Sequence, residues 1–463
     1  MFFLRGHSDT DNIVPAIWFL LEDNASAIVD VIYYRFEFPF LSHPYVTALL
    51  ARFGDRVKLS WVGSFLGLDY EELFQRKEVS PAEATRMREQ LDLDWSQFHR
   101  VFKAHVPAGR RQVKIRYRLW GHGSQRAMTL SMATLSEASS HFSRRSPHIS
   151  QALRQAFIKW VVAEQTTPNL ALFGYQRGRS LAGLFDALRS VGVDKVVRLP
   201  ISPMINVNVL RQPNYVVPNR EEIESMLDFT GFDAVSYTDH IYPENLRKLF
   251  LEMGWGDPLQ GKLAVLGAIR YCPEWIAVRP KPPAFASPND DGRTKIAVFL
   301  SRVKTNTDWH EVRRTFCILE SFPSFHVIVQ PHPRDPDVAD VVGKNVEVRT
   351  DVPSPSLIAW ADIVMLWGSS IGLEALLQNK TLLCPTYLNA NRNAYEMFGG
   401  GWMLRCRDDL VMALAKLQRD PSARTYDNAG VDRLINEIVF AGDREPVPAR
   451  YLDFIRQNEK NSD

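Results

Sequence analysis

Residues 326–334 read His-Val-Ile-Val-Gln-Pro-His-Pro-Arg, and residues 361–376 read Ala-Asp-Ile-Val-Met-Leu-Trp-Gly-Ser-Ser-Ile-Gly-Leu-Glu-Ala-Leu. Each stretch starts with an apolar run typical of a buried strand and continues into a corner of small or hydrogen-bonding residues. Two such corners, about one βα unit apart, indicate an open parallel sheet, which binds ligands at the carboxyl ends of its strands. At this edge of the sheet we expect a site for a phosphorylated ligand such as a nucleotide.

Strand and helix signals alternate along the chain in two blocks, residues 1–267 and residues 295–463. Residues 268–294, which are rich in chain-breaking proline, asparagine and glycine, are interpreted as a linker. Within the first block, residues from about 70 to 160 are charged and helix-forming, and they predict a helical insertion. The predicted fold class is α/β, with two Rossmann-like domains facing each other across a cleft.

Composition narrows the classes of function. A chain of 463 residues is too long for one ordinary core. No apolar segment approaches the ~20 residues of a membrane span, and the first residues do not resemble a secretory signal, so we expect a cytoplasmic enzyme. A formal net charge of +2 argues against a nucleic-acid partner. The four cysteines are far apart and lack zinc-site spacing, and we expect neither a metal nor a cofactor.

A dense cationic stretch is the local exception to this balanced charge. Its members are Arg110, Arg111, Lys114, Arg116 and Arg118. Such runs are most often exposed charge facing water. The alternatives are contact with a polymeric anion and peripheral contact with an anionic lipid surface at the inner face of a membrane.

The first corner of the second block presents a histidine between two prolines. Pro331 and Pro333 stiffen the loop and hold His332 at the strand end. His332 and Arg334 can both donate hydrogen bonds to phosphate oxygens, whereas the alternative is a rigid turn with a structural histidine. After the first strand of this block, Arg302 or Lys304 would neutralise a leaving phosphate.

The second corner carries Ser369 and Ser370 directly before a predicted helix. Free amides at a helix start, including that of Gly372, favour an anion, and the serine hydroxyls add donors. Glu374 would either accept the hydroxyls of a ribose or balance the helix dipole. The polar loop at residues 389–393 is either a lid over the nucleotide or a lead-in to a helix.

These motifs, followed by Asn379-Lys380-Thr381 and Pro385, resemble the nucleotide-binding half of GT-B enzymes that build bacterial surface polymers. The similar families are the bacterial polysialyltransferases, the capsule Kdo transferases and the CDP-glycerol glycerophosphotransferases. The resemblance covers roughly residues 230–405 and includes Leu266-Gly267-Ala268-Ile269-Arg270-Tyr271 with Glu274-Trp275. It implies that His332 with Pro333, and Ser369 with Ser370, hold a cytidine nucleotide donor.

The first block offers candidates for catalysis after its first predicted strand. His7, Asp9 and Asp11 lie in the polar stretch Gly6-His7-Ser8-Asp9-Thr10-Asp11-Asn12, ahead of a helix that we predict from Ile13. A carboxylate at this point would act as a general base or a nucleophile, with Asp9 slightly favoured. Alternatively, these residues are only caps and turn formers.

The function expected from these observations is that of a glycosyltransferase, which moves a sugar from a CMP-, CDP- or UDP-linked donor to a surface polysaccharide or glycolipid acceptor. One alternative is a transferase of alditol phosphate from CDP-glycerol or a relative. Another is a nucleotide-sugar 2-epimerase, which needs no acceptor. A third is a non-catalytic scaffold of a polysaccharide assembly complex.

Overall fold

The computed structural model describes most of the chain outside the predicted insertion. Its described residues are 1–34, 40–61, 113–118, 125–130, 169–174, 178–200, 202–207, 229–254, 259–288, 292–301, 307–332, 346–443 and 445–460, with the single residues 64, 158, 161, 256, 257 and 338.

The first domain is built on a parallel sheet of seven described strands in the order β3-β2-β1-β6-β7-β8-β9. Its strands are β1 (Phe2–Leu4), β2 (Val29–Tyr33), β3 (Val57–Trp61), β6 (Leu170–Phe173), β7 (Lys195–Arg198), β8 (Ala234–Tyr237) and β9 (Leu263–Val265). The helices between them are α1 (His7–Asp23), α2 (Pro44–Phe53), α8 (Gly178–Ser190) and α10 (Ile241–Glu252). Strand order reverses between β1 and β6, so the topological switch point lies there.

The second domain has a parallel sheet of six described strands in the order β12-β11-β10-β13-β14-β15. Its strands are β10 (Thr294–Phe299), β11 (Phe325–Gln330), β12 (Glu347–Val348), β13 (Ile363–Leu366), β14 (Thr381–Pro385) and β15 (Trp402–Leu404). The helices are α12 (Trp309–Glu320), α13 (Ser354–Trp360), α14 (Ile371–Leu377), α15 (Ala394–Phe398), α16 (Arg407–Arg419) and α17 (Asn428–Ile438). The helix α18 (Val447–Lys460) follows them in the sequence. Here the switch point lies between β10 and β13.

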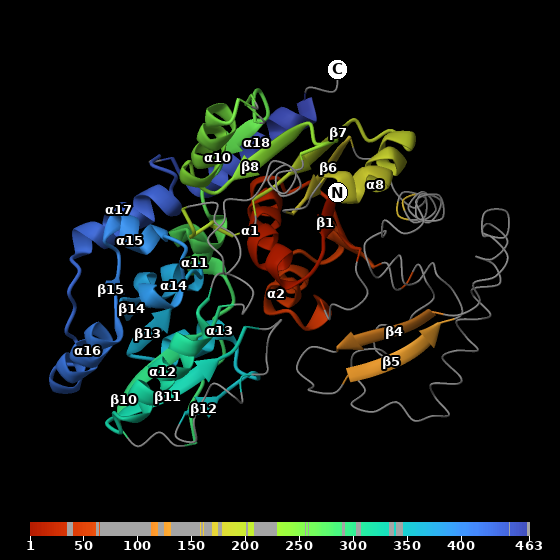
Figure 1. The fold of residues 1–463 in the computed structure, drawn as a ribbon. Helices are drawn as coiled ribbons and strands as arrows, with labels where there is room; N and C mark the ends of the chain where they lie inside the picture. The colour runs from red at the N-terminus through yellow and green to blue at the C-terminus, as the bar shows by residue number, and fades with distance from the viewer. Residues whose placement is uncertain are drawn as a thin grey trace, which may run out of the picture.

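Both sheets contain strands that are buried along their whole length, which explains their continuous apolar sequences. Every residue of β6 and of β13 is buried. Figure 1 shows the two sheets with helices packed around them, and the prediction of an α/β fold with two Rossmann-like domains is confirmed.

The predicted linker, residues 268–294, begins with regular structure. Residues 268–278 contain a 3-10 turn, η3 (Ile269–Tyr271), and the helix α11 (Pro273–Val278). Pro273 occupies the first turn of α11, where proline is tolerated, so this residue does not break the helix. Trp275 is fully buried against Trp18 of α1, which makes the segment part of the core. Irregular chain follows at residues 279–287.

The prediction of a helical insertion was wrong over residues 113–118 and 125–130. Residues 113–118 and 125–130 form two antiparallel strands, β4 and β5, with Val113 opposite Leu130. Alternating cationic and apolar residues in Val-Lys-Ile-Arg-Tyr-Arg fit a strand period of two better than a helix. The cationic residues Lys114, Arg116 and Arg118 lie on β4, whereas Arg110 and Arg111 lie outside the described residues.

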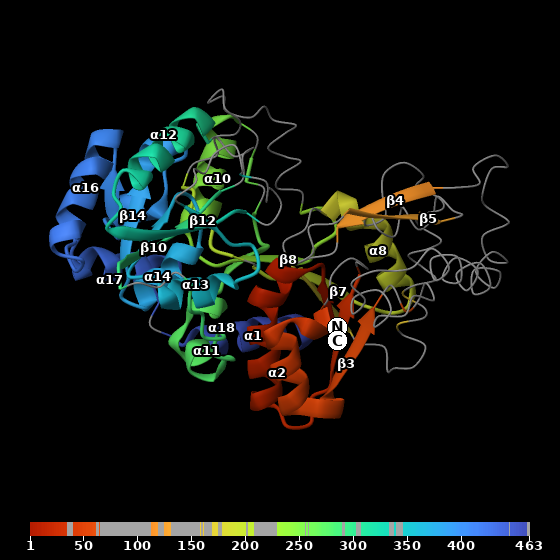
Figure 2. The same cartoon turned by 90° about the horizontal axis from the view of Figure 1, so that it is seen from below.

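The chain returns to the first domain at its end. Helix α18 packs against α1 and β7, although it follows the helices of the second domain in sequence. Figure 2 shows α11 and α18 where the two domains adjoin. Among the described helices, none is long and apolar enough to cross a membrane.

Candidate functional site

The polar stretch after β1 is helical. Helix α1 begins at His7, six residues before the predicted start, because Thr10 N donates to the carbonyl of Gly6 at 2.9 Å and the turn closes there. The Thr10 hydroxyl donates to the same carbonyl at 3.0 Å. The first turns of α1 thus lie at the switch point between β1 and β6, and they carry all three predicted catalytic residues.

Asp9 is buried in contact with the neighbouring backbone. Its carboxylate accepts hydrogen bonds from Arg5 N at 2.9 Å and from Arg5 Nη2 at 3.3 Å. A Cβ atom at Gly174, directly after β6, would lie 2.7 Å from Asp9 Cγ. The glycine is therefore required by the close approach of the carboxylate, and Asp9 fills the switch point of the first sheet.

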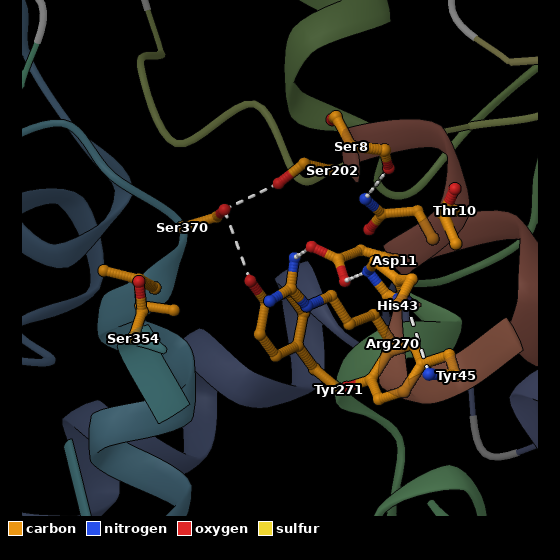
Figure 3. Close-up of polar contacts among 12 residues, drawn as sticks. Ser8, Thr10, Asp11, His43, Tyr45, Ser202, Arg270, Tyr271, Ser354 and Ser370 are labelled. Atoms are coloured by element: carbon orange, nitrogen blue, oxygen red, sulfur yellow. Dashed lines mark hydrogen bonds and ion pairs between the residues drawn. The ribbon is translucent and has the colours of Figure 1, made fainter. Parts of the chain in front are cut away.

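Asp11 forms the centre of a cluster with two partners from distant segments (Figure 3). Arg270 Nη1 donates to Asp11 Oδ2 at 2.8 Å, and His43 Nε2 lies 3.2 Å from Asp11 Oδ1. Tyr45 N donates to His43 Nδ1 at 3.3 Å. Because Nδ1 accepts that bond, the ring proton is assigned to Nε2, which donates it to Asp11. The His7 ring lies 5.4 Å from the ring of His43.

This cluster sets the charge of its members. Burial, and then the neighbouring His43, lower the pKa of His7 to about 4, although Asp11 acts in the opposite direction. Burial raises the pKa of Asp11, but Arg270 and His43 outweigh it and lower the pKa to about 2. At neutral pH, His7 is therefore a neutral imidazole beside an ionised, ion-paired Asp11.

The second sheet contributes two serines from the corner after β13. The Ser370 hydroxyl lies 2.6 Å from the Ser202 hydroxyl, which belongs to the segment after β7 of the first sheet. The Tyr271 hydroxyl donates to the Ser370 hydroxyl at 3.3 Å. Figure 3 shows Ser202 and Tyr271 meeting Ser370 from the opposite domain and from η3. The carboxyl ends of the two sheets are joined at this hydroxyl cluster.

The backbone around the serines is already engaged. At the second switch point, the Ser301 hydroxyl donates to the carbonyl of Trp367. The Tyr395 hydroxyl donates to the carbonyl of Ser369 at 2.7 Å. The amides of Gly372 and Leu373 donate to the carbonyls of Ser369 at 3.5 Å and Ser370 at 3.1 Å. A Cβ atom at Gly372 would lie 2.5 Å from the Tyr395 hydroxyl oxygen, which explains the glycine. In this structure the Gly372 amide, which was predicted to bind an anion, therefore donates to a backbone carbonyl, and Gly372 packs against Tyr395.

Glu374 is buried and forms an ion pair across the domain junction. Arg279, directly after α11, donates from Nη2 to Glu374 Oε1 at 2.7 Å, and the two side chains are only 9% and 2% exposed. The Glu374 carboxylate is paired with the Arg279 guanidinium. Neither of the two roles predicted for Glu374 from the sequence, ribose binding and balance of the helix dipole, includes this ion pair. The ribose role stays a prediction.

The remaining predicted donor-site residues are only partly described. His332 is half-buried and follows β11. Strand β10 lies between β11 and β13 in the sheet, and all three strands are parallel. His332 and Ser369 therefore lie at the same carboxyl edge of the sheet. Gln330 is the last residue of β11, and its side-chain carbonyl accepts a hydrogen bond from the Ser354 hydroxyl at the start of α13. Arg302, Lys304, Pro333 and Arg334 lie outside the described residues.

Sequence reasoning missed Ser202, His43, Arg270 and Tyr271. Arg270 and Tyr271 lie in a segment covered by the family resemblance, which implies no role for either residue. A signal was available for Ser202, because it follows the β7 strand, at the same carboxyl edge as the predicted residues. Within the described ranges, no group of three or more histidine, cysteine, aspartate or glutamate residues is arranged to hold a metal ion.

Comparison with known proteins supports the fold assignment. No protein-family profile and no curated protein sequence matches the chain. A crystal structure of a putative UDP-N-acetylglucosamine 2-epimerase from Listeria monocytogenes is similar at 12% identity and a TM-score of 0.51, covering 100% of this chain and 97% of that one. This likeness shows that the chain has the two-domain architecture of GT-B folds.

Two further solved structures are similar with lower TM-scores. The UDP-GlcNAc 2-epimerase from Neisseria meningitidis, bound to UDP-GlcNAc, has 10% identity and a TM-score of 0.49 over 98% of this chain and 99% of that one. The calicheamicin glycosyltransferase CalG4 has 15% identity and a TM-score of 0.41 over 99% of this chain and 98% of that one.

Proposed function

We propose that the protein is a glycosyltransferase that moves a sugar from a nucleotide-activated donor to a glycan or glycolipid acceptor. The observation that carries the proposal is the contact of 2.6 Å between the hydroxyls of Ser202 and Ser370. It joins the carboxyl edges of the two sheets, and such edges are where α/β folds bind nucleotides and substrates. A donor held by one domain would thus lie beside an acceptor held by the other.

The second domain would hold the nucleotide part of the donor. Its proposed contacts are His332, Pro333, Arg334, Ser369, Ser370, Gly372, Glu374, Arg302 and Lys304. Hydroxyl and cationic donors suit phosphate oxygens, whose negative charge increases as the bond to the sugar breaks. The bond between the anomeric carbon and the phosphate oxygen breaks as the nucleotide leaves, and the acceptor oxygen forms the new bond to that carbon.

The first domain would orient the acceptor hydroxyl and take its proton. Among the candidates His7, Asp9 and Asp11, the ion pair of Asp9 with Arg5 favours a structural role for Asp9. The neutral imidazole of His7 can accept a proton, and the ionised Asp11 stabilises the imidazolium that would form. We therefore assign proton transfer to His7 and a supporting charge to Asp11.

The second candidate function is nucleotide-sugar 2-epimerisation. The Listeria structure, with similarity over the whole chain, is described as a putative UDP-N-acetylglucosamine 2-epimerase. An epimerase and a transferase would share a nucleotide site and differ in their need for an acceptor. Conversion of the donor to an isomer without a second substrate would favour the epimerase.

Turnover of a donor panel tests the proposal directly. Purified protein is incubated with UDP-, CMP- and CDP-linked donors, with and without glycan acceptors, and products are followed by NMR. We expect acceptor-dependent release of one nucleotide, and a loss of about 100-fold or more in His332→Ala. His310→Ala, on the exposed face of α12, is the matched control and should retain full activity.

Each other outcome of this panel has a distinct meaning. Transfer of glycerol phosphate from CDP-glycerol would make the protein an alditol-phosphate transferase. Full activity of His332→Ala would remove the assigned donor site. Absence of both turnover and nucleotide binding would favour the non-catalytic scaffold. Salt-sensitive binding to anionic liposomes would support membrane contact through the cationic stretch at residues 110–118.

A further inference from the structure

The turn η3 carries two adjacent side chains that contact opposite domains. Arg270 reaches back to Asp11 on α1 of the first domain, at 2.8 Å. Tyr271 reaches Ser370, at the corner between β13 and α14 of the second domain, at 3.3 Å. Figure 3 shows these two side chains between Asp11 and Ser370. A single turn is therefore bonded to the polar clusters of both domains.

The two side chains from η3 are largely buried, and their hydrogen bonds to Asp11 and Ser370 are partly buried. Side-chain exposure is 13% for Arg270, and Tyr271 is 1% exposed. The pairing of Arg270 with Asp11 outweighs burial and raises the pKa of the guanidinium, so its charge is secure. Charge-assisted hydrogen bonds in such surroundings are stronger and more directional than exposed ones. The contact of Arg270 with Asp11 therefore favours one geometry, and the neutral hydroxyl bond of Tyr271 with Ser370 adds a second constraint.

The turn itself is held firmly in place. Tyr271 N donates to the carbonyl of Ala268 at 2.9 Å, which closes the turn. Ala268 N donates to the carbonyl of Val439 at 2.8 Å, and the Tyr451 hydroxyl donates to the carbonyl of Gly267 at 3.0 Å. Val439 follows α17 and Tyr451 lies on α18, where the chain returns to the first domain. Both crossings between the domains thus meet at η3.

We infer that Arg270 and Tyr271 are positioning residues, which fix the spacing between the Asp11–His43 cluster and Ser370. The inference rests on the proposed function, in which these clusters serve the acceptor and the donor. Neither residue is assigned contact with substrate. Their role would be to hold the acceptor-side and donor-side groups at the separation that the transfer requires, where a displacement of 1 Å costs about 100-fold in rate.

A distance between the domains can be measured without any substrate. Cys317 on α12 is exposed and accepts a spin label, whereas Cys272 and Cys384 are buried. A labelling parent therefore carries Cys406→Ser, to remove the other exposed thiol, and Lys248→Cys on α10, where the side chain is 76% exposed. Pulsed electron paramagnetic resonance then gives the distance distribution between α10 and α12.

Variants are made in this parent with matched controls. Arg270→Gln with Tyr271→Phe removes both contacts, whereas Arg270→Lys and Tyr271→Phe alone are mild changes that preserve folding. Tyr387→Phe removes a hydroxyl contact to Thr315 within the second domain. Arg189→Gln removes an ion pair with Asp233 within the first domain. Thermal unfolding is recorded for every variant, so that loss of stability is separated from loss of positioning.

We expect one narrow distance in the parent, in both controls and in Arg270→Lys, and a broader distribution in the double variant. Turnover of the double variant should fall about 100-fold, with the donor KM changed less than about twofold. Superimposable distributions would overturn the inference, and so would a broadened distribution with unchanged turnover. Absence of nucleotide binding in the parent would contradict the proposed function instead, and the distance measurement would still decide the role of the turn.

Discussion

A glycine after β6 shows how a single residue constrains the site. Gly174 leaves room for the carboxylate of Asp9, and a Cβ atom there would lie 2.7 Å from Asp9 Cγ and 2.9 Å from Oδ1. The nearest atoms are all in one side chain, so the clash depends on the carboxyl group. The glycine after β6 is thus explained by the side chain of Asp9 on α1, which is far away in the sequence.

Gly174→Ala should destabilise the protein by about 1–3 kcal/mol, because the new methyl group overpacks the switch point. In an Asp9→Ala background the same substitution should cost almost nothing, since the obstructing atoms are gone. Urea denaturation of the wild type, Gly174→Ala, Asp9→Ala and the double variant measures this coupling. Equal costs in both backgrounds would show that Asp9 is not the obstacle.

Asp11 should make the stability dependent on pH in acid. Its pKa is lowered to about 2 in the folded state, below the ordinary value of 3.8. A depressed folded pKa means that its stabilisation is complete above about pH 4 and is lost as the pH falls from 4 towards 2. With a discount for the 24% exposure of the side chain, the loss is about 1–2 kcal/mol.

Urea denaturation of the wild type and of Asp11→Asn between pH 5 and pH 2.5 checks this expectation. The wild type should be the more stable protein at pH 5, because the variant leaves Arg270 buried without its charged partner. The difference in free energy of unfolding should narrow as the pH falls. A constant difference across this range would contradict the ion pair.

Residues of the site divide into those visible in the sequence and those that are not. Asp11, His332 and Ser370 could be named because each follows a recognisable apolar strand. Tyr271 meets Ser370 across 99 positions, Ser202 meets it across 168, and Arg270 meets Asp11 across 259. Contacts of such sequence separation leave no local pattern, so only the folded chain reveals them.

Elements with one dominant pattern were predictable. Strands such as β11 and β13 were recognised because burial on both faces demands an uninterrupted apolar sequence. The start of α1 was placed too late, because the polar stretch His7–Asn12 reads as a turn although its hydrophilic side chains meet a polar cluster from other segments. Helix α11 was likewise hidden by prolines, one of which begins it.

The ion pair between α14 and the residue after α11 offers a test at the level of elements. Glu374→Gln should destabilise the protein by about 3–5 kcal/mol, because Arg279 would remain buried and charged without its partner. Arg279→Met combined with Glu374→Leu should recover most of this loss, since an apolar pair needs no compensation. Chemical denaturation measures both. A loss below about 1 kcal/mol in the single variant would indicate an ineffective pair.

At the scale of the whole molecule, the last helix belongs structurally to the first domain. Helix α18 contacts α1 and β7, and its Tyr451, Phe454 and Ile455 are buried in the core cluster that includes β1. This return could not be predicted from the sequence, because the amphipathic pattern of a helix does not specify which surface it covers. Two chain crossings, one after α11 and one before α18, therefore connect the domains.

Ile455→Ala should lower the free energy of unfolding by about 2–5 kcal/mol, and the destabilised elements should be those of the first domain. Hydrogen exchange followed by mass spectrometry should show faster exchange in α1 and β7, with α12 and α16 unchanged. Ile28→Ala, at a residue that is 60% exposed, is the control and should change neither the free energy of unfolding nor the exchange rates. Faster exchange confined to the second domain would contradict the placement of α18.

The central claim, that this two-domain protein binds an activated sugar through its nucleotide, is tested most directly by thermal unfolding with CMP, CDP, UDP, GDP and ADP. A ligand that binds only the folded state at 100 times its Kd adds about 2.7 kcal/mol to the stability. We predict that one nucleotide selectively raises the Tm by several degrees in the wild type and in His310→Ala, and that His332→Ala loses this shift. Absence of a shift with every nucleotide would contradict the claim.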